Sequence, residues 1–301
     1  MKAQPSILKA ALWMAGWLSL MLVTAIAGRE TTQELDVFQV MLVRSVIGFF
    51  MLYPLVHASG GLAAMKTARP LGHIGRNVVH YTGQYLWLYA LTLIPLAQLI
   101  AIEFTMPIWT AILAVVFLGE RMNIWKNTAI VLGLIGVAII VRPGGAINPG
   151  QLYALASAVG FAISVVMVKS LTRTESVVKI IFWMLIIQSL IGLIPAIPVW
   201  RWPSLEVWPW LFVIAFGGTF SHYCMARAML HADATVVVPM DFLRVPLTAL
   251  AGWLIYSERV DTITVLGATL ILAGNMLNLK SAGTARIRPA LDTESSGPTS
   301  N

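Results

Sequence analysis

The stretch that decides the fold is residues 90–140, ALTLIPLAQLIAIEFTMPIWTAILAVVFLGERMNIWKNTAIVLGLIGVAII, because a weaker copy of it returns in the second half of the chain, starting at Ala228. The second copy includes MDFLRVPLTALAGWLIYSERV at residues 240–260. Matches among apolar residues often arise by chance, so the polar matches carry the argument. At one fixed offset they pair Thr110 with Thr248, Glu120 and Arg121 with Glu258 and Arg259, and Glu103 with Asp241. Each copy therefore places one carboxylate within a long apolar stretch, and the chain reads as an internal duplication.

The composition of the chain excludes a soluble globular protein. Of its 301 residues, 58% are hydrophobic and 11% are charged, and this charged share is about half that of a soluble domain. Apolar runs of roughly 18 to 23 residues, long enough to cross a bilayer as helices, recur along the whole sequence. The lone Cys224 excludes a disulfide within the chain and a thiolate metal site. The sequence therefore predicts an all-α polytopic membrane protein.

We predict ten transmembrane helices joined by short loops. They cover residues 9–27, 38–56, 75–93, 96–118, 124–141, 150–170, 178–199, 207–229, 234–256 and 260–279. The first is expected to be a retained helix and not a cleaved signal peptide, because no small-residue cleavage site follows it. Residues 281–301 are polar and rich in Ser, Thr, Gly and Pro, and we expect a disordered cytoplasmic tail there.

Lys and Arg are distributed unequally between alternate loops. With the N-terminus inside, fourteen lie in the inner segments and four in the outer loops. This is the positive-inside bias of membrane proteins, so we expect both termini in the cytoplasm and the chain in a bacterial inner membrane. The same bias accounts for the net charge of +7, and we expect no nucleic-acid partner.

The duplication has a predicted topology. Five predicted helices separate equivalent positions of the two copies, and an odd number of crossings turns the second copy over. The predicted fold is therefore ten transmembrane helices arranged as two inverted five-helix repeats, residues 1–141 and 150–280. Inverted repeats are the usual architecture of secondary transporters, which alternate between two faces of the membrane.

The endings of the two copies carry a family resemblance. FLGER closes the fourth predicted helix and IYSER closes the ninth, and with its two five-helix repeats the chain resembles the EamA branch of the drug/metabolite transporter superfamily. The layout around VWRWPSLEVW and HADATVVVPMDFLRVP also resembles members that carry S-adenosylmethionine. The resemblance implies a central cavity, lined by helices one, three, four, six, eight and nine, with alternating access to it. It brings no catalytic motif.

Two acids within the predicted helices are the first candidates for function, because a charged side chain in the bilayer is costly unless it faces a partner or a wet cavity. Helical spacing places Glu103 on one face with Thr110, and Asp241 on one face with Thr248. We expect both acids to face one cavity, where at least one binds a proton or a cationic part of the substrate. The alternative for Asp241 is a structural ion pair with Arg244, three residues on. For Glu103, which has no cation nearby in sequence, the alternative is a hydrogen bond to a neighbouring helix.

Further candidates lie on polar or aromatic faces of other predicted helices. They are Asn77, His80, Tyr81 and Gln84 in the third helix, Thr219 and His222 in the eighth, and Trp13 and Trp17 in the first. We expect the polar residues to line the cavity and the tryptophans to form a wall against a planar or cationic ligand. The alternatives are hydrogen bonds that only join helices and, for the tryptophans, packing against lipid. Arg44, near the start of the second helix, is expected to extend towards the membrane surface.

Prolines and glycines predict how the helices bend and pack. Pro107 and Pro246 follow the two acids and are expected to kink their helices and free backbone carbonyls. Small residues allow close approach of membrane helices. The glycines expected to do so here are Gly133, Gly136, Gly267 and Gly274.

The sequence thus predicts a secondary active transporter that moves a small polar or amphipathic metabolite by alternating access, with proton coupling and exchange both open. Substrates resembling S-adenosylmethionine, an amino acid or a vitamin fit this prediction. No catalytic motif or Walker sequence is found, so we expect no enzymatic activity, no cofactor and no metal. A membrane-embedded enzyme or a non-transporting membrane subunit is the alternative. The expected partners are the substrate and the lipid bilayer, and the chain is expected as a monomer or homodimer.

Overall fold

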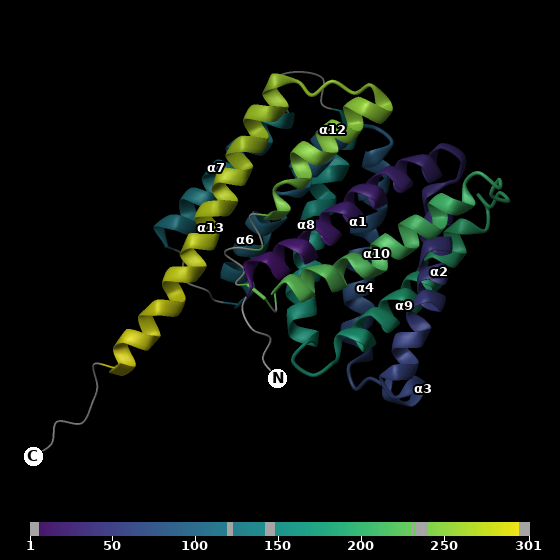
Figure 1. Cartoon of the computed structure of the whole chain (residues 1–301), viewed down its shortest axis with the longest axis horizontal. Coiled ribbons are helices and arrows are strands. Elements are labelled where there is room, and N and C mark those ends of the chain that lie inside the picture. The colour runs from purple at the N-terminus through teal and green to yellow at the C-terminus, as the bar shows by residue number, and fades with distance from the viewer. Residues whose placement is uncertain are drawn as a thin grey trace, which may run out of the picture.

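The structure is a bundle of helices (Figure 1). The computed structural model describes residues 6–118, 123–141, 148–229, 231–232, 237 and 240–294, and it describes the backbone alone at residues 114, 117, 118, 169, 222, 226, 229 and 279–294. All regular secondary structure within these ranges is helical, as predicted. Six segments are long and apolar enough to cross a membrane, namely Ile7–Glu34, Val37–Ala58, Leu96–Leu113, Ile124–Val141, Pro149–Val168 and Val177–Ala196.

The helices follow one another with short connections. In chain order they are α1 (Ile7–Glu34), α2 (Val37–Ala58), α3 (Gly61–Ala64), α4 (Pro70–Leu91), α5 (Leu96–Glu103), α6 (Met106–Leu118), α7 (Ile124–Val141), α8 (Pro149–Leu171), α9 (Val177–Ala196), α10 (Trp208–Met229), α12 (Arg244–Tyr256) and α13 (Thr262–Glu294). Several of the helix starts recur at one constant offset, the same as that of the sequence repeat. The helices α4 and α10 begin at positions 70 and 208, α6 and α12 at 106 and 244, and α7 and α13 at 124 and 262.

Local side chains set where several helices begin. The carboxylate of Asp36 accepts a hydrogen bond from the Phe38 amide at the start of α2, which satisfies a backbone donor that a helix end leaves unpaired. At the start of α8, Asn148 and Gln151 form a capping box, and Pro149 occupies the first turn. These caps explain why loops of only a few residues suffice between helices.

The fourth predicted helix is interrupted at its acid, so α5 ends at Glu103 and α6 begins at Met106. Pro107 has no N–H to donate to the Glu103 carbonyl four residues earlier. The backbone tightens instead, and the Ile108 amide donates to the Thr105 carbonyl at 2.9 Å. The Phe104 carbonyl, left without its helical donor, accepts a hydrogen bond from Asn275 Nδ2 at 2.7 Å. The predicted freeing of a backbone carbonyl is confirmed at Pro107.

The expectation that each acid shares a continuous helical face with a threonine is wrong. The interruption places Glu103 in α5 and Thr110 in α6. Asp241 likewise precedes a two-residue turn, after which α12 begins and carries Thr248. The proline after each acid removes a hydrogen bond of the regular helix, so the acid and the threonine do not keep a common helical register.

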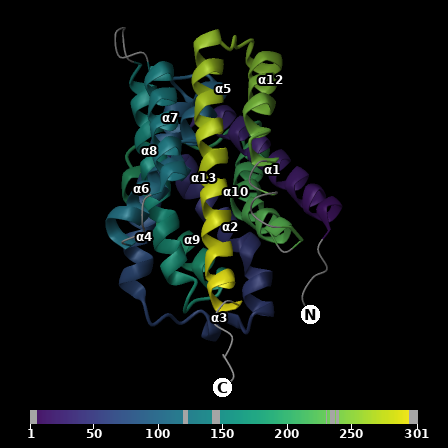
Figure 2. The ribbon, with the colours of Figure 1, turned by 90° about the vertical axis from the view of Figure 1, so that its left-hand side faces the viewer.

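Four pairs of helices pack most extensively against each other: α7 with α13, α1 with α10, α4 with α8, and α2 with α9. Figure 1 shows α7 and α13 together at one side of the bundle, and α2 with α9 towards the other. The helix α13 runs without interruption along the side of the bundle that it shares with α7 (Figure 2). It continues to Glu294, so residues 281–294 are helical where we expected a disordered tail. Residues 295–301 lie outside the described range.

Glycines bring the backbones of α7 and α13 into contact, as predicted. A Cβ atom on Gly136 would lie 2.6 Å from the carbonyl oxygen of Gly267, and a Cβ atom on Gly267 would lie 2.6 Å from that of Gly136. A Cβ atom on Gly274 would lie 2.7 Å from the carbonyl oxygen of Ala129. Helix association in lipid depends on such close van der Waals contact, because lipid tails are as apolar as the helix surfaces.

The substitution Gly136→Ala is expected to lower the melting midpoint of the purified protein, because the added methyl group collides with the Gly267 backbone. Overpacking of this kind costs roughly 1–3 kcal/mol, whereas alanine gains about 1 kcal/mol over glycine within a helix. The matched control is Gly75→Ala, whose Cβ atom meets only the flexible end of Met167, at 3.3 Å. Melting curves of both variants in one detergent check this, and a midpoint for Gly136→Ala at or above that of Gly75→Ala would contradict it.

Candidate functional site

One guanidinium group lies between two carboxylates at the centre of the candidate site. Arg244, the first residue of α12, donates from Nη1 to Oε1 of Glu103 at 2.8 Å. Its Nη2 and Nε atoms each lie 3.4 Å from an oxygen of Asp241. The ion pair between Asp241 and Arg244, given above as the alternative for Asp241, is therefore present. The shorter of the two contacts, however, joins Arg244 to Glu103, 141 residues away.

The three charged groups are largely withdrawn from solvent. The Arg244 side chain is 6% exposed, and each acid side chain is 13% exposed. Removing one partner from a buried ion pair costs about 3–5 kcal/mol, because the remaining charge stays buried without compensation. With both acids ionised, the cluster carries one negative charge more than Arg244 neutralises.

Each acid also accepts a hydrogen bond from a tryptophan. Trp17 of α1 donates to Oδ1 of Asp241 at 2.6 Å, and Trp87 of α4 donates to Oε2 of Glu103 at 2.7 Å. An indole N–H that is buried usually finds an acceptor. We predicted a role for Trp17 but missed Trp87. The signal for Trp87 was its position three residues after Gln84, on the same face of α4.

An aromatic ring lies over the guanidinium group of Arg244. The Cζ atom of Arg244 lies 4.8 Å from the ring centroid of Phe104. Phe104 and Phe242 meet edge to face, with centroids 5.5 Å apart. These two residues immediately follow the two acids and are equivalent positions of the two copies. The interruptions of the two acid-bearing segments thus meet each other, and the cluster that we call the central cluster comprises Glu103, Asp241, Arg244, Trp17 and Trp87.

A second polar group lies between α2, α4 and α10. Arg44 Nη2 donates to Oε1 of Gln84 at 2.7 Å, and its Nη1 atom is 3.8 Å from the position of a Cβ atom on Gly218. The expectation that Arg44 extends towards the membrane surface is therefore wrong. The side chain turns inward because Gln84 offers an acceptor and Gly218 leaves room for the guanidinium group. Tyr81 lies one turn from Gln84 in α4 and is 5% exposed.

The remaining predicted residues lie apart from the central cluster or bond within their own helices. The hydroxyl groups of Thr110, Thr219 and Thr248 donate to carbonyls of their own helices. Asn77 is buried with Arg76 and the His73 carbonyl as its partners. His80 packs against Phe161. Trp13 lies under the guanidinium group of Arg227 and against Tyr223. The side chain of His222 lies outside the described part of the chain.

A third network closes the end of the bundle at which α1 and α12 finish. Arg29 pairs with Glu258 and donates to the carbonyls of Leu91 and Ile94 at 2.6 to 3.1 Å. Glu258 also accepts from the Leu96 amide at 3.0 Å. These bonds join α1, the α4–α5 loop and the end of α12. Glu258 thus both forms a salt bridge with Arg29 and caps the start of α5 at Leu96, while the equivalent residues Glu120 and Arg121 lie outside the described residues.

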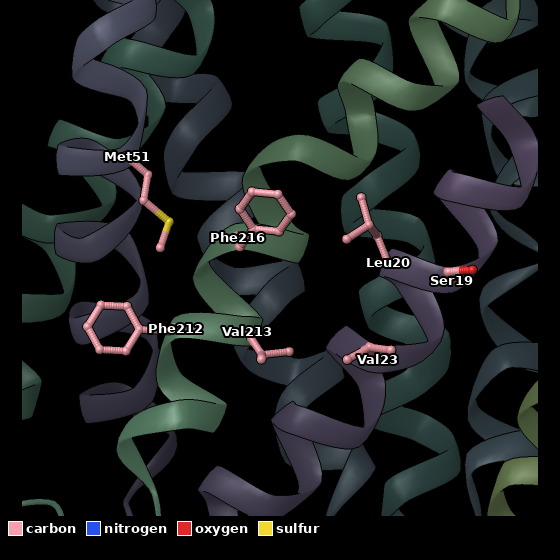
Figure 3. Close-up of a pocket in the computed structure, with 7 residues that line it drawn as sticks. All are labelled: Ser19, Leu20, Val23, Met51, Phe212, Val213 and Phe216. Atoms are coloured by element: carbon pink, nitrogen blue, oxygen red, sulfur yellow. The ribbon is translucent and has the colours of Figure 1, made fainter.

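A surface pocket lies away from these polar groups. It has a volume of about 380 Å³ and lies between α1, α2 and α10 (Figure 3). It is lined by Ser19, Leu20, Val23, Met51, Phe212, Val213 and Phe216. This lining is almost entirely apolar, so the pocket offers nothing to orient a polar metabolite. Among the described residues, no group of three or more His, Cys, Asp or Glu side chains is placed to hold a metal ion.

Comparisons with known proteins match both halves of the chain. The EamA-like transporter family model matches residues 8–142 and again residues 148–280. The chain is 30% identical over 271 residues to the S-adenosylmethionine uptake transporter of Rickettsia prowazekii (strain Madrid E), covering 88% of this chain and 92% of the relative. It is 29% identical over 271 residues to the riboflavin transporter of Vibrio cholerae serotype O1, covering 88% and 91%.

A solved crystal structure has the same fold. It matches with a TM-score of 0.61 at 18% sequence identity, over 89% of this chain and 95% of that one. At this identity the likeness concerns the fold alone. The match of the family model to both halves, with relatives covered nearly in full, shows that the chain belongs to the EamA-like transporter family of the drug/metabolite transporter superfamily and is a multi-pass membrane transporter of small metabolites, not an enzyme.

Proposed function

We propose that the chain is a secondary active transporter that moves a small polar or amphipathic metabolite by alternating access, and that the central cluster is its substrate or proton site. The observation that carries this proposal is the Arg244 guanidinium group held by two acids from the two halves of the chain. S-adenosylmethionine and riboflavin, named for its relatives, are the first substrates to test.

The proposed architecture is ten transmembrane helices in two inverted five-helix repeats, residues 1–141 and 150–280. Two observations support it. Three helix starts recur at the offset of the sequence repeat, and the main helix pairs keep their pattern when the halves are exchanged. The equivalent helices are α1 and α8, α2 and α9, α4 and α10, and α7 and α13. When each helix is replaced by its equivalent, the pairs α2–α9 and α7–α13 stay the same, and α1–α10 becomes α8–α4, which is also a main pair. A pseudo-twofold relation between the halves would produce this pattern.

The mechanism that we propose depends on competition for the two acids. A proton or a substrate cation that binds Glu103 or Asp241 weakens the hold of that acid on Arg244. The helix α12, which begins at Arg244, is then free to move relative to α5. A ligand shifts such an equilibrium only by its difference in affinity between the two states. The two acids supply this difference, because they pair with Arg244 in one state and with the ligand in the other.

The network around Arg29 and Glu258 is proposed as the closure on the outer face. The distribution of Lys and Arg favours cytoplasmic termini, and on that assignment the ends of α1 and α12 lie outside. We propose a bacterial inner-membrane location and a monomer or homodimer. The polar residues Asn77, His80, Tyr81, Gln84, Thr110, Thr219, His222 and Thr248, with Trp13, are proposed as further cavity-lining positions.

Glu103→Gln and Asp241→Asn are each expected to slow counterflow of the transported metabolite in proteoliposomes by at least about tenfold. The loss of a charged partner from a buried pair is worth about 3–5 kcal/mol, and about 1.4 kcal/mol corresponds to a factor of ten. Glu206→Gln is the matched control, because Glu206 is an exposed acid. Counterflow of labelled S-adenosylmethionine and of riboflavin, measured at several pH values, tests this. Full transport with unchanged pH dependence in both variants would refute the proposed site.

Arg29→Gln is expected to open the outer face. With Cys224 replaced by Ser, a cysteine introduced at Ala97, which is 3% exposed and adjoins Leu96, reports on opening. A membrane-impermeant thiol reagent should label Ala97→Cys at least about tenfold faster when Arg29 is also replaced, because a lost ion pair in a partly buried site destabilises closure. Arg201→Gln, at an exposed arginine, should leave the labelling rate unchanged. Equal rates in the Arg29 and Arg201 variants would rule out this role.

A further inference from the structure

Arg44 is a positive charge inside the bundle without a carboxylate beside it. Its hydrogen-bond partner is the neutral Gln84, at 2.7 Å, and among the described residues no acid lies within 4.0 Å of its guanidinium group. An arginine inside a membrane bundle normally pairs with an acid, a carbonyl or a ligand. The guanidinium fork matches the two oxygens of a carboxylate. Arg44 therefore has capacity for an anion that the described residues do not supply.

Two buried polar groups on α4 and α9, both of which pack against the helix α2 that carries Arg44, lack hydrogen-bond partners in the described structure. They are the Tyr81 hydroxyl group and the side-chain amide of Gln188, in residues that are 5% and 0% exposed. The Tyr81 hydroxyl oxygen lies 2.9 Å from the position of a Cβ atom on Gly192, one turn after Gln188 in α9. A buried polar group without a partner costs roughly 1–3 kcal/mol, so both groups favour the arrival of a further polar ligand.

The anion-binding capacity lies next to the central cluster. Gln84, which accepts from Arg44, and Trp87, which donates to Glu103, are three residues apart on one face of α4. Three residues of a helix rise about 4.5 Å. With both acids ionised, the central cluster carries one negative charge more than Arg244 neutralises, whereas the positive charge of Arg44 has no acid beside it. Two subsites of opposite sign are therefore adjacent along α4.

We propose that Arg44, with Tyr81 and Gln188, binds the carboxylate of a zwitterionic substrate whose cationic group lies at Glu103 and Asp241. This inference rests on the proposed function and names the substrate class: a metabolite with an amino-acid moiety, in which a carboxylate and a cation are separated by a few bonds. S-adenosylmethionine has this pattern of charge, whereas riboflavin has neither charge. The chain thus takes the zwitterionic type of substrate and not the flavin type.

The test compares the effect of removing the ligand's carboxylate with the effect of removing the charge of Arg44. The dissociation constants of S-adenosylmethionine, methionine and lysine are measured with purified protein, each beside its decarboxylated amine. At least one of the three carboxylate ligands should bind the wild-type protein roughly thirtyfold or more tightly than its decarboxylated amine does, since breaking a buried charge pair has effects of this size. In Arg44→Gln the carboxylate ligand and its amine should have similar dissociation constants. Arg173→Gln, at an exposed arginine, should keep the wild-type ratio.

A merely structural role for Arg44 would weaken the acid and its amine equally, and an unchanged ratio in Arg44→Gln overturns the inference. If that variant does not fold, Tyr81→Phe, which removes only the hydroxyl group, should narrow the same ratio, and an unchanged ratio there also overturns it. If riboflavin binds and shows counterflow while no zwitterionic ligand binds, the inference is overturned but the proposed transport function is not. Absence of counterflow for every metabolite tested would instead remove the proposed function.

Discussion

The structure depends on the burial of one guanidinium group and two carboxylates inside an apolar bundle. Each of these groups loses hydration worth several kcal/mol when it is buried, and only well-placed partners recover that loss. Arg244 is satisfied when Glu103 and Asp241 are both within reach. Because the two acids belong to different halves of the chain, the cluster is complete only when both halves are packed together. In the proposed function, a cation acts at the same interaction that joins the two halves.

The interruption of the acid-bearing helix makes this cluster possible and has its own cost. A free backbone carbonyl in the bilayer interior must be satisfied from elsewhere in the protein. Asn275, on α13, donates to the carbonyl of Phe104, and the same helix is held to α7 by the contact between Gly136 and Gly267. The glycine contact thus places the asparagine at the interruption, and the helix pair at the side of the bundle supports the centre.

The helix α12 connects the central cluster to the network at the far end of the bundle. It begins at Arg244 and ends at Tyr256. The Tyr256 ring lies beneath the guanidinium group of Arg29, with 4.9 Å from Cζ to the ring centroid, and its hydroxyl group donates to Glu30 at 2.7 Å. A helix of 13 residues is about 20 Å long. In the proposed mechanism, one short rigid element would carry a displacement of Arg244 to the contacts around Arg29, and it would connect the proposed substrate site with the proposed closure.

The sequence by itself determined the membrane-spanning helical class, the duplication and the candidacy of Glu103 and Asp241, because apolar length and the cost of buried charge are properties of the chain alone. It also offered the pair between Asp241 and Arg244 as an alternative, because these residues are close in the sequence. Only the tertiary structure decided that Arg244 also binds Glu103, that Trp87 supports this acid, and that Arg44 turns inward. These contacts join side chains of different helices, from 16 to 141 residues apart, and no helical period or spacing records which side chain of another helix will be met. They are decided by how the helices pack.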